Sequence, residues 1–147
     1  MRRKSDLDAA TLSPDVGSVF ASYDEPVRAR LLGLRQLMYE TAAKTEGVGE
    51  LEETTEGGQP SYLTSETRSG TTVRIDAVKG EPEKYALYVN CQTNLIETFR
   101  ELYRDELCLQ GNRAVIFDVG DTLPKDIVRH CLSLALTYHR NKVRRHL

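Results

Sequence analysis

The sequence predicts an α+β fold, in which helices pack against an antiparallel sheet of about five strands. Apolar residues recur every three or four positions near both ends of the chain, which is the period of an amphipathic helix. Between these regions, short β-rich runs alternate with turns that contain glycine and proline. We therefore expect the order helix, helix, four strands, helix, strand, helix, a grouping typical of the α+β class. A chain of 147 residues, 39% of them hydrophobic, fits one domain with its own core.

Two helix-start signals open the ordered part of the chain. Residues 1–12 are polar and lack periodicity, so we interpret them as a flexible arm that precedes a single domain over residues 13–147. Ser13 and Pro14 are typical of a helix N-terminus, and Asp24–Pro26 repeats the signal. The apolar residues expected on the buried faces of the two helices are Val16, Val19, Phe20 and Tyr23, then Val27, Leu31, Leu34, Met38 and Ala42. The side chains expected on the solvent face of the second helix are Arg28, Arg30, Arg35, Gln36 and Glu40.

The middle of the chain predicts a meander of antiparallel strands. Three turn sequences separate its β-rich runs, at residues 57–60, 69–70 and 79–83. Residues 71–78 alternate like a strand with one buried face, and residues 85–91 are the expected partner strand. The apolar set of the first strand is Val73, Ile75 and Ala77, and its polar set is Thr72, Arg74 and Asp76.

The last third of the chain predicts a helix, a strand and a final helix. Thr93 is the expected cap of the first of these helices, and residues 112–119 form an apolar strand. Residues 121–124 carry the start signal of the last helix. The expected buried face of this helix is Ile127, Cys131, Leu134, Ala135 and Tyr138.

One segment of the predicted sheet matches a known pattern. Residues 52–62 contain an acid ahead of Gly-Gly-x-Pro-x-Tyr, and a lysine follows the third strand. The five matching residues are Glu53, Gly58, Pro60, Tyr62 and Lys79. This pattern resembles the YdhG-like family of uncharacterised domains, although Gly57 and Val78 stand where that family has aromatic residues. The resemblance, which covers roughly residues 14–141, implies a curved antiparallel sheet flanked by helices.

The same segment suggests a ligand site. Two adjacent glycines allow close approach to the backbone, and Tyr62 offers an aromatic face with a hydroxyl. We therefore expect a small ligand to contact the sheet around the five matching residues. Ordinary turn chemistry at residues 57–60 is the alternative. The functions of YdhG-like domains are mostly unassigned, and some members are described as frataxin-like intracellular iron chaperones.

A cluster of glutamates gives a second hypothesis. Alternation along a strand places Glu50, Glu52 and Glu56 on one face and Glu53 on the other. Carboxylate oxygens bind hard cations, and ferrous iron accepts such ligands, so these four residues are candidate iron ligands. The alternative is an edge strand that its charges keep from pairing with other chains.

Other features exclude whole classes of function. No apolar run approaches the roughly 18 residues of a membrane helix, and three widely spaced cysteines fit reduced thiols, so we expect a cytoplasmic protein. The ends of the chain are basic, but the pI of 5.9 does not favour nucleic-acid binding. His130 beside Cys131 is interpreted as a surface histidine next to a buried thiol, not as a catalytic pair.

Three hypotheses for function remain open. The first is a non-enzymatic domain that binds a small molecule, since no catalytic motif is present. The second is a frataxin-like iron-binding protein. The third is a protein-interaction module that forms a homodimer.

Overall fold

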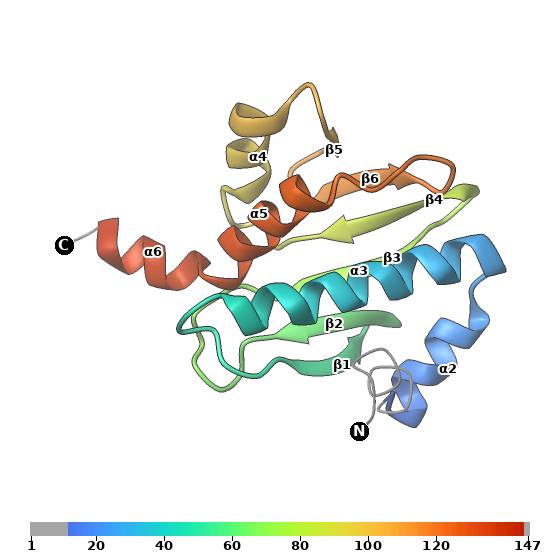
Figure 1. Cartoon of the computed structure of the whole chain (residues 1–147), viewed down its shortest axis with the longest axis horizontal. Coiled ribbons are helices and arrows are strands. Elements are labelled where there is room, and N and C mark those ends of the chain that lie inside the picture. The colour runs from blue at the N-terminus through green and yellow to red at the C-terminus, as the bar shows by residue number, and fades with distance from the viewer. Residues whose placement is uncertain (1–11, 146–147) are drawn as a thin grey trace.

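The structure, a computed structural model, describes residues 12–145 (Figure 1). Its helices are α2 (Pro14–Ser22), α3 (Glu25–Lys44), α4 (Leu95–Tyr103), α5 (Lys125–Leu136) and α6 (Tyr138–Arg145). Its strands are β1 (Glu52–Glu56), β2 (Gln59–Leu63), β3 (Val73–Val78), β4 (Glu81–Tyr88), β5 (Cys108–Gln110) and β6 (Ala114–Asp118). The predicted arm over residues 1–12 lies outside the described residues except for Leu12, which packs against the core.

The strands form one antiparallel sheet in the order β1-β2-β3-β4-β6-β5, so the predicted α+β class is confirmed. The sheet has six strands and not about five. The additional strand is β5, which pairs with β6 at the edge of the sheet. It has only three residues, too few to show an alternating pattern in the sequence.

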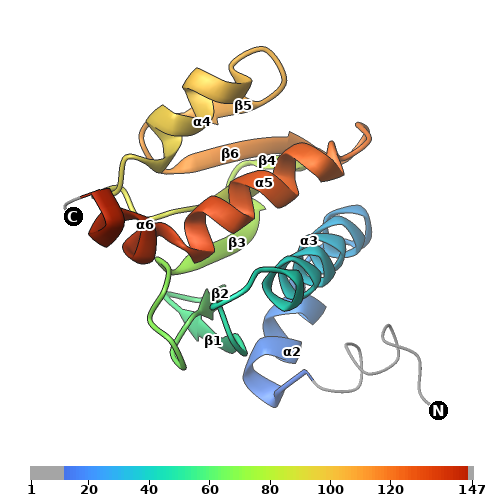
Figure 2. The ribbon, with the colours of Figure 1, turned by 60° about the vertical axis from the view of Figure 1, so that its left-hand side comes forward.

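Helices α3 and α5 lie over one face of the sheet (Figures 1 and 2). Buried residues of α2, α3, α4 and α5 share one cluster with the inward-facing residues of the strands. A second, smaller cluster contains strand residues alone: Ala86, Ala114 and Ile116, flanked by Val78 and Tyr88. We call the side of the sheet that carries this second cluster the open face.

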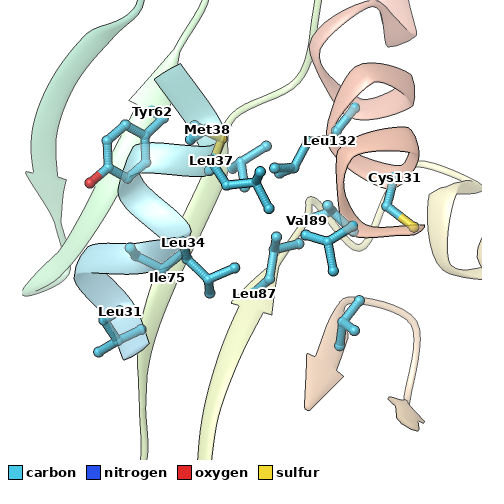
Figure 3. Close-up of a cluster of buried hydrophobic side chains, with 14 of the residues drawn as sticks. Leu31, Leu34, Leu37, Met38, Tyr62, Ile75, Leu87, Val89, Cys131 and Leu132 are labelled. Carbon is cyan, nitrogen blue, oxygen red and sulfur yellow. The ribbon is translucent and has the colours of Figure 1, made fainter. Parts of the chain in front are cut away.

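The core lies between α3, α5 and the sheet (Figure 3). All five apolar residues predicted on the buried face of α3 are buried, and so are Val73 and Ile75 of β3. The predicted cap of α2 is also confirmed, because Ser13 Oγ accepts a hydrogen bond from the backbone N–H of Val16. The sequence predicts these elements correctly because the spacing of their apolar residues indicates both the type of element, helix or strand, and the face that it buries.

Two helix predictions need correction. The cap residue of α4 is Asn94, one residue after Thr93, whose hydroxyl accepts a hydrogen bond from the Leu95 N–H. The last helix is broken at Thr137 into α5 and α6, and the buried face of α5 is rotated from the predicted one. The residues that α5 buries are Val128, Cys131, Leu132, Ala135 and Leu136.

The loop between β2 and β3 explains the break between α5 and α6. The Thr71 N–H and the Ser69 hydroxyl donate to the carbonyls of Ala135 and Leu136, at the C-terminal end of α5. The Ser69 carbonyl accepts from the N–H groups at the start of α6. The loop therefore bonds backbone groups at the end of α5 and the start of α6 that would bond to each other in a continuous helix. Gly70 allows this approach, because a Cβ there would lie 2.4 Å from the Leu136 carbonyl oxygen.

No helix in residues 12–145 is both long enough and apolar enough to cross a membrane.

Candidate functional site

Glu53 and Tyr62, two of the predicted ligand residues, lie together on the helix-covered side of the sheet. They face each other across β1 and β2, and the Tyr62 hydroxyl donates to Glu53 Oε2 over 2.8 Å. Arg35 of α3 completes the group through two hydrogen bonds to the Glu53 carboxylate, of 2.5 and 2.9 Å. The Arg35 guanidinium also lies 5.0 Å from the centre of the Tyr39 ring. We call Arg35, Glu53 and Tyr62 the buried triad.

The buried triad is shielded from water. The Arg35 side chain is 4% exposed, that of Glu53 is 9% exposed, and Tyr62 is fully buried. Burial by itself lowers the pKa of Arg35, but the hydrogen bond and charge of Glu53 outweigh it, so the pKa is raised overall. Burial, then the charge and hydrogen bond of Glu53, also raise the pKa of Tyr62. The prediction that Arg35 faces solvent is wrong, because Arg35 is buried and pairs with the Glu53 carboxylate of β1.

The other three predicted ligand residues lie outside the buried triad. Gly58 is exposed in the turn between β1 and β2, and Lys79 is exposed in the turn between β3 and β4. Both turns lie at the same end of the antiparallel sheet. Pro60 is buried within β2. The structure thus joins Glu53 with Tyr62, keeps Pro60 two residues from Tyr62 on the same strand, and places Gly58 and Lys79 in exposed turns. The shared role of the five residues in binding stays a prediction.

The four glutamates proposed as iron ligands engage different partners. Glu53 belongs to the buried triad, Glu52 accepts a hydrogen bond from Ser65, and Glu56 pairs with Arg74 over 3.0 Å. Glu50 is exposed in the segment before β1. Within residues 12–145 no three histidine, cysteine or acidic side chains form a group that could bind a metal ion. Iron binding by these four glutamates stays a prediction.

The open face carries a row of side chains that crosses four strands. Ser61 of β2 is opposite Arg74 of β3, which is opposite Tyr88 of β4, which is opposite Ala114 of β6. Directly opposed residues share a face of the sheet and lie close enough for their side chains to touch. Ser61 is fully buried and Ala114 is 5% exposed, so the larger Arg74 and Tyr88 project above small neighbours.

A depression of about 250 Å³ lies on the open face beside Arg74 and Tyr88. Its lining comes from β2, β3, the end of β4 and the turn before β6, and consists of Gln59, Thr72, Arg74, Tyr88, Val89, Asn90, Cys91 and Arg113. The Arg113 guanidinium lies 5.7 Å from the centre of the Tyr88 ring. Arg113 thus lies near the phenol ring and Arg74 lines the same depression, whereas no carboxylate of the described residues does.

Several polar groups of this lining have no partner within the described residues. The guanidinium of Arg113 makes no ion pair or hydrogen bond there, and neither the Tyr88 hydroxyl nor the Thr72 hydroxyl makes a hydrogen bond. Burial, with the charge of Asp76, raises the pKa of Tyr88 against the opposing effect of Arg113. The phenol is therefore neutral near pH 7 and retains a proton to donate.

Two acidic side chains near the depression, Glu56 and Asp76, already have ion-pair or hydrogen-bond partners. Glu56 pairs with Arg74 in an exposed ion pair, with side chains 37% and 43% exposed respectively. Asp76 accepts hydrogen bonds from the Tyr23 hydroxyl, from Gln59 Nε2 and from its neighbouring backbone N–H. The depression itself thus presents hydrogen-bond donors and positive charge.

A wider, more open depression of about 840 Å³ lies at the C-terminal end of α3. It is lined by Tyr39, Ala42, Ala43, Thr45, Glu46, Gly47, Gly49, Glu50, Leu51 and Glu66. Its three carboxylates form no metal-binding group, and its lining includes no arginine or lysine. It offers fewer converging groups than the depression on the open face.

Sequence reasoning found only part of the open-face site. The alternation of β3 places Arg74 on the polar side, and the odd spacing of Tyr85 and Tyr88 places them on opposite faces, as the structure confirms. The same alternation places Thr72 beside Arg74 on the polar side, but Asn90 and Arg113 were missed, because each lies just outside the regular part of a strand. No local pattern indicates that three separate strand ends meet.

Two remaining predictions concern exposed groups. Cys131 is buried and His130 is exposed, as predicted, and burial raises the pKa of Cys131 to about 12. His130 Nδ1 instead contacts the Tyr103 hydroxyl at 2.5 Å. The surface gives little indication of a dimer interface, since Leu102 is the one large apolar side chain that is exposed among the described residues. The homodimer hypothesis stays a prediction.

Comparisons of this chain with protein-family models, with curated proteins and with solved structures give no significant match.

Proposed function

We propose that this protein is a small-ligand-binding domain of the YdhG-like kind, and that its site is the depression on the open face of the sheet. The observation that carries the proposal is the set of converging polar groups in that depression, where the Arg113 guanidinium and the hydroxyls of Tyr88 and Thr72 make no hydrogen bond within the described residues. Binding sites are typically concave and contain a few well-placed polar groups. The volume of about 250 Å³ lies just below the usual range of about 300–1,000 Å³, which favours a small ligand.

The rigid surroundings support the same proposal. The depression rests on the paired strands β3, β4 and β6, whose other face is covered by the main core. Arg74 and Tyr88 lie within these paired strands, so the sheet holds their backbone in place without a ligand, which lowers the entropic cost of binding. By contrast, the buried triad has its groups paired with one another and is shielded from solvent. The triad is therefore assigned a role in stability.

The proposal is tested by screening the ¹⁵N-labelled protein against a fragment library that contains neutral, cationic and anionic compounds. We expect hits to shift the backbone amide signals of residues around Thr72, Tyr88 and Arg113. A screen in which no fragment of any charge shifts these signals would refute the proposal.

A matched pair of variants locates the site. Thr72→Tyr places a ring in the depression, whereas Thr54→Tyr places one on the same face but on the edge strand β1, outside the lining. We expect the first variant to lose binding of the fragments and the second to retain it. Loss in both, or in neither, contradicts the proposed location.

A further inference from the structure

We infer that the ligand of the open-face depression is a small organic anion, whose carboxylate or phosphate group binds between Arg113 and Arg74. This inference rests on the proposed function and adds the chemical class of the ligand. Among the described residues, the lining contains two arginines and no acidic residue. An anion is the ligand that such a lining recognises.

The two arginines are expected to contribute differently. Arg74 already shares its charge with Glu56, at 3.0 Å. Arg113 has no carboxylate partner within the described residues, and its guanidinium rests near the ring of Tyr88. Because an unpaired guanidinium retains all its N–H donors, Arg113 is the primary anchor and Arg74 the secondary one.

Neutral donors complete the recognition. The Tyr88 hydroxyl and the Thr72 hydroxyl line the same depression, and neither is used within the described part of the chain. Each donates readily to an anionic oxygen, and hydrogen bonds to charged groups are the stronger kind. Tyr88 also contributes an aromatic ring to the lining of the depression. A ligand that combines an anionic group with a small ring uses all of these features.

The experiment compares ring compounds that differ in one group: benzoate, phenyl phosphate, benzamide and benzylamine. Each is titrated into the full-length ¹⁵N-labelled protein, and the affinity is read from the amide shifts around the depression. We expect benzoate or phenyl phosphate to bind at least about tenfold more tightly than benzamide, and benzylamine not to bind, because only the anions pair with guanidinium. The preferred anion distinguishes a carboxylate ligand from a phosphate ligand.

Two variants test the assignment of the anchor. Arg113→Gln is expected to weaken anion binding at least about tenfold, while Arg104→Gln, which changes an exposed arginine outside the depression, leaves it unchanged. Thermal unfolding of both variants should match that of the unmodified protein, which excludes a folding effect. The affinity for the anions is also expected to fall as the salt concentration is raised, because salt screens the charge of the arginines.

The outcomes separate the two proposals. If benzamide or benzylamine shifts the same amides with an affinity equal to that of the anions, the inference fails but the binding site stands. An Arg113→Gln variant that binds the anions normally also overturns the inference. If none of the four compounds and no library fragment acts on the depression, both proposals fail.

Discussion

Replacing Arg35 with methionine is expected to destabilise the fold more than any change of an exposed charge. The Glu53 side chain is 9% exposed in the unmodified protein, and the substitution removes its cation and leaves the Tyr62 hydroxyl as its one side-chain donor among the described residues. Removing one partner of a buried ion pair costs about 3–5 kcal/mol. At about 2–4 °C per kcal/mol for a chain of this size, Tm is expected to fall by about 6–20 °C. Urea unfolding followed by circular dichroism measures the loss directly.

Two further variants separate charge from packing. Arg35→Met combined with Glu53→Gln removes both charges but leaves an amide oxygen to accept from Tyr62, so it should regain much of the lost stability. Arg129→Met breaks the Arg129–Asp126 ion pair, whose side chains are 38% and 98% exposed, and should cost less than about 1 kcal/mol. The reasoning is refuted if Arg35→Met costs no more than Arg129→Met, or if the double variant is as unstable as the single one.

Three other predictions follow from the packing of particular groups. Gly70→Ala should destabilise the protein by about 1–3 kcal/mol in urea unfolding, because the new Cβ meets the backbone of α5. The control is Gly33→Ala in α3, which should cost less because a Cβ there meets no atom within 4 Å. Iodoacetamide at pH 8, followed by mass spectrometry, should modify the exposed Cys91 and Cys108 and leave the buried Cys131 unmodified, and rapid labelling of Cys131 in the folded protein would contradict its burial. The free energy of unfolding should fall as pH rises above about 10, because the raised pKa values of Tyr23 and Tyr62 keep both protonated in the folded state while the unfolded chain ionises. Tyr23→Phe should flatten that decline, and an equally steep decline in the variant would contradict the explanation.

The buried triad shows how far a sequence pattern reaches. The resemblance to YdhG-like domains singled out Glu53 and Tyr62, and alternation placed Glu53 on the face opposite to Glu52 and Glu56. The structure puts the pair in contact as neighbours on β1 and β2. Arg35 was assigned to solvent because an arginine beside an apolar stripe usually faces water. Its burial depends on a carboxylate 18 residues away, which no helical period reveals.

The sequence by itself determined the α+β class, the positions of α2 and α3, and the two faces of β3. Each of these follows from a period of 3.6 or 2 residues, which is a local property of the chain. Only the tertiary structure decided the burial of Arg35, the break between α5 and α6, the short edge strand β5 and the depression beside Tyr88. These features depend on contacts between segments far apart in the chain, such as Ser69 with Leu136 or Tyr88 with Arg113. Such contacts are set by the packing of the sheet and helices, and no local period encodes which strand ends that packing brings together.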